Sequence, residues 1–216
     1  MHRLFSSFLT AAFIAVSVPT SSLATVVLQV GIDEMTHTSQ VILHATVESV
    51  ETVTLPDRPG AVFTDVTFVG LEALKGSALL VNNRLTVRVI GGKTENYEVR
   101  IPGMPLFRSG EEVVVFLEKT EDSFAFCGLG QGVFRVETDG LTGEKVVTRN
   151  TGGLGFATFD HQGRFEMSDA PRPLRNLPLA MLLEEIRIYV DRENTATPVA
   201  PVDAPKAQLP KLVPLP

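Results

Sequence analysis

The chain has 216 residues, of which 44% are hydrophobic and 20% charged, with 17 Gly, 14 Pro, no Trp and one Cys. Its apolar content is typical of a folded domain rather than a disordered chain, and a single cysteine excludes both an intramolecular disulfide framework and a multi-cysteine metal site. The formal net charge of −6 disfavours nucleic acid as a partner, because phosphate binding requires a basic surface.

The first 24 residues have the pattern of a secretory signal peptide. A short basic start, residues 1–3, precedes the apolar run Leu4–Val18, and the small residues Ser22 and Ala24 stand where a signal peptidase reads the chain. We therefore predict cleavage before Thr25. The apolar run is shorter than the roughly 20 residues that span a bilayer, so no transmembrane segment is expected. The predicted product is exported, either periplasmic or secreted.

The longest predicted elements are two strands that form a curved hairpin. Val41–Val53 alternates between apolar and polar residues, which predicts a half-buried strand. The turn Pro56–Gly60 leads to a second strand, Ala61–Leu74, in which Gly70 marks a bulge or bend. The first strand is predicted to carry Val41, Leu43, Ala45 and Val47 on one face and His44, Thr46 and Glu48 on the other.

Shorter β-type runs follow, separated by Gly, Pro, Asn and Asp, with weaker signals at Gly155–Asp160 and Gly163–Met167. Because helices do not alternate with these strands, the sequence disfavours a parallel α/β fold. The further predicted strands are Arg84–Ile90, Asn96–Ile101, Glu112–Glu118, Ser123–Gly128, Gly132–Thr138 and Glu144–Arg149.

Two helices and a tail complete the prediction. A short helix over Gly31–Ser39 precedes the first long strand. Pro178–Glu193 places apolar residues at helical spacing, and we interpret this amphipathic helix as a lid on the end of a barrel. Residues 194–216 contain six prolines and are predicted to form an extended, Pro-rich tail.

No sequence motif indicates catalysis. The glycine-rich stretches Gly128–Gly132 and Thr151–Gly155 lack the Lys-Ser/Thr of a phosphate-binding loop, and the histidines are too far apart for a local metal motif. Cys127 lies in an apolar run and is interpreted as a buried small hydrophobe, with a catalytic or intermolecular thiol as the alternative. We therefore predict no enzymatic activity, no cofactor and no metal.

The most distinctive segment is Gly103–Glu118, in which Phe107 is expected to anchor a turn that Gly110 permits. With it, an ordered set of motifs resembles a family of exported bacterial β-barrel proteins of unknown function, over about Ile32–Val136. The resemblance implies a fold rather than an activity. The other matching motifs are Ala45–Val50, Leu74–Gly76, Gly91–Gly92 and Gly128–Phe134.

The Leu-Lys-Gly ending at Leu74–Gly76, after a long curved hairpin, is also similar to netrin and tissue-inhibitor-of-metalloproteinase domains, which use OB-type barrels. Those inhibitors insert an N-terminal cysteine amine into a protease zinc site. The expected mature chain begins at Thr25 without such a cysteine, so the resemblance implies architecture alone.

These observations predict an all-β protein, with a partly open OB-like antiparallel barrel, an extra β-hairpin region and a C-terminal amphipathic helix over residues 25–193. The leading functional hypothesis is an exported, non-enzymatic binding or structural module for a protein or envelope component; a secreted-protease inhibitor or accessory protein, and then a hydrolase, are the alternatives. The predicted contact surface consists of His44, Thr46, Glu48, Lys93, Tyr97 and Met104, from one strand face and the loop Gly91–Pro105.

Overall fold

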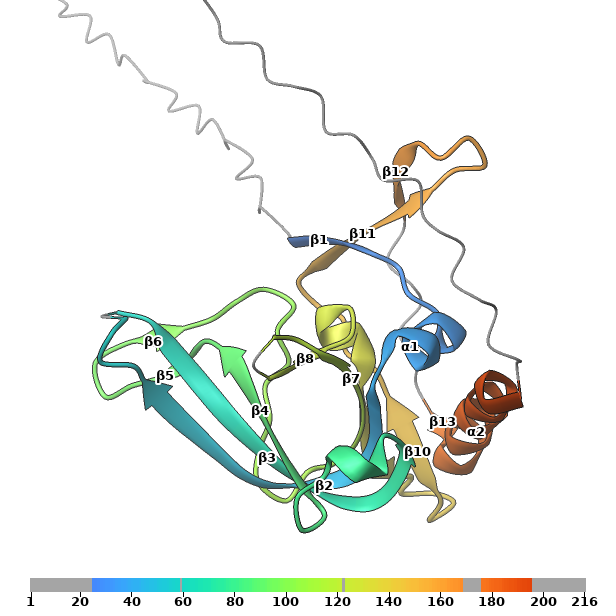
Figure 1. Ribbon diagram of the computed structural model, residues 1–216, viewed down its shortest axis with the longest axis horizontal. Helices are drawn as coiled ribbons and strands as arrows, with labels where there is room; N and C mark the ends of the chain where they lie inside the picture. Colours follow the sequence, from blue (N-terminus) through green and yellow to red (C-terminus); the bar gives the residue numbers. More distant parts are fainter. Residues whose placement is uncertain (1–24, 59, 122, 169–175, 196–216) are drawn as a thin grey trace, which may run out of the picture.

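The computed structural model describes residues 25–58, 60–121, 123–168 and 176–195. The predicted signal peptide, and the predicted tail from residue 196 onward, lie outside these ranges. The described residues form a mostly antiparallel β structure with two α-helices (Figure 1). The prediction is therefore confirmed in its coarser part: the protein is mostly β, with antiparallel sheets and two helices. No helix among the described residues is long and apolar enough to cross a membrane.

The elements are short except for one hairpin and the C-terminal helix. Two 3-10 helices interrupt the strands, η1 (Ser77–Leu79) and η2 (Leu129–Gly132). The helices are α1 (Ile32–Thr38) and α2 (Leu179–Thr195). The strands are β1 (Thr25–Leu28), β2 (Val41–Thr54), β3 (Val62–Lys75), β4 (Arg84–Ile90), β5 (Gly92–Lys93), β6 (Glu98–Val99), β7 (Glu112–Lys119), β8 (Phe124–Phe126), β9 (Val133–Thr138), β10 (Lys145–Thr148), β11 (Leu154–Phe159), β12 (Phe165–Ser168) and β13 (Leu177–Pro178).

The predicted long hairpin is confirmed as β2 and β3, which pair antiparallel along nearly their whole length. The register shifts beside Ala45, where Leu71 is the extra residue next to Gly70. The side chain of Asn83 leaves no room for a side chain at position 70. Its amide donates to the Gly70 carbonyl, and a Cβ at Gly70 would lie 2.8 Å from Asn83 Oδ1. The predicted bulge at this glycine is therefore confirmed, and it bends the hairpin.

The largest sheet is curled, and both of its faces are buried at the centre. Its strands run in the order β13-β10-β9-β7-β2-β3-β4, with β8 added beside β7. Val113, Val115 and Leu117 of β7 point into an inner core enclosed by the curl, together with Phe68, whereas Val114 and Phe116 point to an outer core. The inner core also contains the four apolar residues predicted for one face of β2, namely Val41, Leu43, Ala45 and Val47.

The two helices cover the outer core. Leu182 and Ile186 of α2 are fully buried there beside Met35 of α1. The prediction of α2 as a lid on a barrel end is therefore wrong: it packs against the outer face of the sheet (Figure 1). The reason is the double-sided burial of β7, since Val114 and Phe116 would otherwise face solvent.

Ion pairs with β3 fix the position of α2. Arg187 makes a bidentate contact with Glu72, with Nη2 to Oε1 at 2.8 Å. Near the end of the helix, Glu193 accepts hydrogen bonds from Lys75 at 2.7 Å and contacts His37 of α1 at 2.9 Å. The helix is thus held to the sheet by charge as well as by its apolar stripe.

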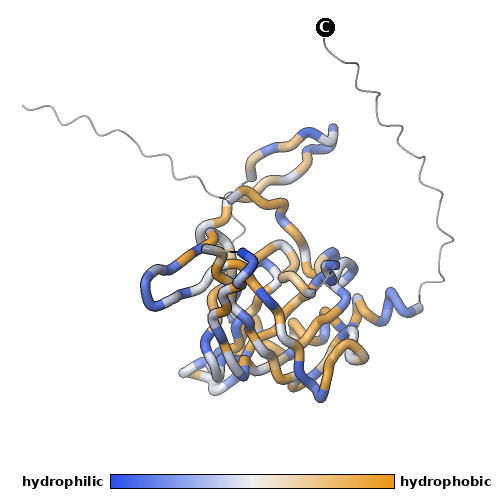
Figure 2. The backbone as a smooth tube through the Cα atoms, turned by 60° about the vertical axis from the view of Figure 1, so that its left-hand side comes forward, coloured by the Kyte–Doolittle hydropathy of each residue, from blue (hydrophilic) through white to orange (hydrophobic). Residues whose placement is uncertain are grey.

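A second, three-stranded sheet stands away from the body. β11 pairs antiparallel with β12 and parallel with β1, and the hairpin projects with hydrophilic residues at its tip (Figures 1 and 2). The register places a row of exposed apolar side chains on one face of this sheet: Val26, Leu28, Phe159, Phe165 and Met167.

A buried glutamine attaches β1 and the segment after it to the body. Gln131 is fully buried within η2. Its Oε1 accepts from the Val30 backbone amide at 3.1 Å, and its Nε2 donates to the Leu28 carbonyl at 2.8 Å. One side-chain amide therefore satisfies a donor and an acceptor of the main chain, as a neighbouring strand would.

Replacing this amide should destabilise the protein. We expect Gln131→Ala to lower the free energy of unfolding by about 3 kcal/mol, because it leaves a cavity and buried main-chain groups without partners. Gln131→Glu keeps the size but cannot donate to Leu28, so it should also be strongly destabilised. Urea unfolding measures both, with exposed Gln162→Ala as control. A Gln131→Ala protein as stable as the control would contradict this role.

Candidate functional site

The candidate site lies where β2 and β3 extend beyond the ladder between β2 and β7. β7 pairs with β2 only between Val41 and Thr46, whereas the β2–β3 pairing continues to Thr54. Residues 91–107, which follow β4 and include the short strands β5 and β6, lie over the inner face of this overhanging half and border a pocket of about 420 Å³.

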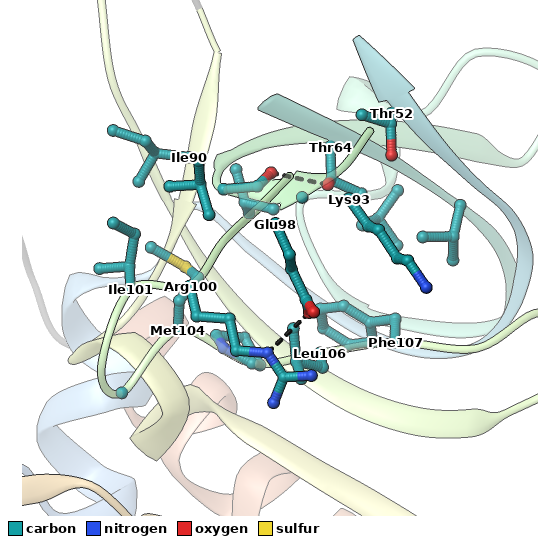
Figure 3. Close-up of a pocket in the computed structure, with 18 of the residues that line it drawn as sticks. Thr52, Thr64, Ile90, Lys93, Glu98, Arg100, Ile101, Met104, Leu106 and Phe107 are labelled. Atoms are coloured by element: carbon teal, nitrogen blue, oxygen red, sulfur yellow. Dashed lines mark hydrogen bonds and ion pairs between the residues drawn. The ribbon is translucent and has the colours of Figure 1, made fainter. Parts of the chain in front are cut away.

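The wall of this pocket is mainly apolar on both sides. Val50 and Val66 belong to the hairpin, and Val89 belongs to β4. The volume lies within the range of sites that hold small molecules. Thr64 contributes a hydroxyl, but it already donates to the Gly91 carbonyl at 2.8 Å (Figure 3). The covering segment contributes Ile101, Met104, Leu106 and Phe107.

Phe107 anchors the covering segment, as the sequence predicts. Its ring is 5.4 Å from that of Phe68 in an edge-on contact and 5.2 Å from that of Phe126. Behind it, Gly110 has φ +86° and donates its amide to the Val47 carbonyl, which confirms the tight turn. An aromatic anchor at one end fixes the position of the pocket wall.

Three charged side chains line the pocket: Lys93, Glu98 and Arg100 (Figure 3). Lys93 and Glu98 are cross-strand partners in the β5–β6 ladder. Glu98 accepts a hydrogen bond from Arg100 at 2.6 Å, and this bond holds the pKa of the Glu98 carboxyl below its usual value. Among the described residues Lys93 makes no ion pair within 4.0 Å.

A second hollow, of about 680 Å³, lies on the other side of the same wall. Both hollows are lined by Gly103–Phe107, and the second also by charged residues of β9 and the turn before β7. Arg135 lies 3.8 Å from Glu111 and also donates to the Leu106 carbonyl, whereas Arg108 and Glu137, which line it too, make no ion pair within 4.0 Å among the described residues. The first hollow has the more apolar wall, and we therefore take it as the candidate site.

The structure divides the predicted contact surface into two groups. Lys93 and Met104 line the pocket, and Tyr97 lies 47% exposed in the turn between β5 and β6. The other three predicted residues, His44, Thr46 and Glu48, belong to the part of β2 away from the pocket lining. The structure thus brings only Lys93 and Met104 together at the pocket.

His44 and Glu48 are engaged in contacts with other strands. His44 is buried and contacts Glu112 at 2.7 Å, while Lys145 donates to the same carboxylate at 2.8 Å. Glu48 receives two hydrogen bonds at 2.8 Å from Arg84. These contacts link β2 to its neighbour β7 and, across β3, to β4, so the geometry gives both residues a structural role.

Sequence reasoning missed several pocket residues. Thr52 and Thr64 were not predicted as contacts, Arg100 was included only as part of the loop Gly91–Pro105, and Phe107 was predicted only as an anchor. The available signal was the hairpin length, since 14-residue strands beside an eight-residue β7 must extend beyond the ladder with it. The predicted strand Asn96–Ile101 contracts to Glu98–Val99, and this irregularity lets the segment turn over the pocket.

The predicted interpretation of Cys127 as a buried small hydrophobe is confirmed. The residue is only 2% exposed and packs in the outer core. Burial is the main cause, and the nearby Glu118 a smaller one, that together raise the pKa of its thiol to about 12. The thiolate that nucleophilic chemistry requires is therefore suppressed at neutral pH.

No protein-family model and no curated protein sequence matches the chain. Within the described ranges, no group of three or more His, Cys, Asp and Glu side chains is arranged to hold a metal ion. The candidate site therefore rests on its own geometry.

The Glu112 cluster should make stability depend on pH. Burial raises the pKa of Glu112, but hydrogen bonds from Lys145 and His44 outweigh it and leave the pKa below its ordinary 4.5. Because the folded pKa is depressed, the stabilisation is present above the unfolded pKa and is lost as the pH falls through the folded one. We expect Glu112→Gln to cost about 1 kcal/mol at neutral pH and less in acid. Urea unfolding across this pH range measures the difference, and a pH-independent difference would contradict it.

The Cys127 thiol should be inert in the native protein. We expect no reaction with a thiol-specific disulfide reagent at neutral pH and one equivalent in denaturant, because folding both buries the sulfur and raises its pKa to about 12. Absorbance of the released thiolate gives the stoichiometry. Rapid native labelling would restore the reactive-thiol alternative.

Proposed function

We propose that the protein is an exported, non-enzymatic binding module whose site is the apolar pocket between the overhanging half of β2–β3 and residues 91–107. The observation that supports this proposal is the pocket itself, which has a volume of about 420 Å³, a mainly apolar wall and few polar groups. Such sites bind small apolar or amphipathic molecules by removing apolar surface from water. A ligand there would contact Lys93 and Met104 of the predicted surface.

We also propose that the curled sheet is a partly open OB-type barrel. β2 pairs with both β3 and β7, β3 pairs with β4, and β7 pairs with β8. The cyclic order β2-β3-β4-β8-β7 corresponds to the five-stranded Greek-key arrangement of that fold. β8 approaches β4 without an antiparallel ladder between them, so the described strands do not form a closed barrel.

Export and the lack of catalysis belong to the same proposal. The signal pattern of residues 1–24 supports a periplasmic or secreted location, and the inert Cys127 thiol supports a binding role over a thiol enzyme. No observation on the described residues favours the alternatives, a protease inhibitor or a hydrolase.

Filling the pocket should abolish binding. We expect the protein to bind the neutral fluorophore N-phenylnaphthylamine with increased emission, and Val50→Trp to weaken this at least about tenfold by occupying the cavity. Val50 is partly exposed, so the larger ring does not have to enter the inner core. Fluorescence titration measures both affinities.

The matched control is Val81→Trp, which adds the same ring at an exposed site outside the pocket lining. It should bind as the unmodified protein does. Absence of binding to the unmodified protein, or equal loss in both variants, would refute the pocket as a site.

A further inference from the structure

The charged side chains that line the pocket carry a net positive charge, which favours an anionic ligand. Of its three charged lining residues, two are cationic and one is anionic. The Glu98 carboxylate is occupied by Arg100 at 2.6 Å, and Figure 3 shows its carboxylate directed at Arg100 while Lys93 extends in another direction. The Lys93 ammonium is therefore the surplus charge of the pocket, in a chain whose net charge is −6.

The apolar interior offers no partner to a second charge, and Thr52, which also lines the pocket with a hydroxyl, is exposed to solvent. Val50, Val66 and Val89 form one side, and Met104 and Phe107 form the other. The hydroxyl of Thr64 is already used by the Gly91 carbonyl. A charged group pushed into this region would lose its hydration without a partner, whereas a hydrocarbon chain would gain free energy there. The pocket therefore has an apolar inner part and a cationic mouth.

We infer that the pocket binds a free amphipathic carboxylate, with its hydrocarbon chain against Val66, Met104 and Phe107 and its carboxylate paired with the exposed Lys93 ammonium. This inference rests on the proposed binding function and adds the ligand class. A carboxylate of ordinary acidity is ionised at neutral pH, so it can accept a charge-assisted hydrogen bond from the ammonium. Its headgroup stays at the solvent, where it costs little desolvation.

Three ligands of equal chain length separate the contributions of chain and charge. Laurate, dodecanol and dodecylammonium share one hydrocarbon chain and differ in headgroup charge. Isothermal calorimetry below the micellar concentration should give affinities in the order laurate, dodecanol, dodecylammonium. The laurate affinity should fall with added salt, because exposed charges are screened, and the dodecanol affinity should not.

Lys93→Gln tests the headgroup contact directly. We expect it to weaken laurate roughly five-fold, the effect of one solvent-exposed ion pair, and to leave dodecanol unchanged. Lys93→Arg should retain the preference for laurate. Lys119→Gln removes the same charge from an exposed site outside the pocket lining and is the matched control. Equal effects on laurate and dodecanol in Lys93→Gln would overturn the inference.

The outcomes separate this inference from the proposed function. If N-phenylnaphthylamine and dodecanol bind but laurate has no advantage, the pocket is a binding site and the carboxylate inference is wrong. If none of these compounds binds, both fail. Sedimentation with phosphatidylglycerol vesicles tests the membrane as the source of the anion: Lys93-dependent binding to vesicles would overturn a free amphiphile, and no binding would support it.

Discussion

Burial of the central strands on both faces is the constraint on which the rest of the structure depends. β7 alternates Val113, Val115 and Leu117 toward the inner core with Val114 and Phe116 toward the outer core. A strand that is apolar on both sides requires two covers. The curl of the sheet supplies one, and the two helices supply the other. This double cover also explains how a chain with one cysteine can be stable, since disulfides are needed chiefly where the core is small.

The pocket lies where the hairpin is no longer part of this doubly covered centre of the sheet. Beyond Thr46, β2 no longer pairs with β7, and the inner face of the hairpin is covered there by residues 91–107, whose regular structure is limited to the short strands β5 and β6. Glycines let the backbone of this segment pack closely: Gly91 has φ +102°, and a Cβ there would lie 2.8 Å from the Val99 carbonyl. Such a segment covers an apolar face without filling it. The space it leaves is therefore a consequence of strand length.

Local pattern was sufficient to predict the hairpin, the bulge at Gly70 and both helices, because each is indicated by residues close in sequence. Phe107 was predicted as an anchor, but not its partners Phe68 and Phe126, which are distant in sequence. The relation between elements was harder to predict. The apolar stripe of α2 indicated burial but not which surface would receive it, and Pro178 lies in β13 rather than in the helix. Of the predicted contact residues, His44 and Glu48 have partners 68 and 36 residues away, and no alternation pattern contains that information.

The contacts of β1 and of the residues after it reach far along the chain. The buried Gln131 amide bonds to Leu28 and Val30 across about a hundred residues, and β1 pairs with β11 later still. Synthesis proceeds from the N-terminus, so β1 is made early but finds its neighbours only after residue 157 exists. Until then its apolar residues have no native surface to join, and loop closure of this length is slow. The first strand of the fold is consequently among the last to be fixed in place.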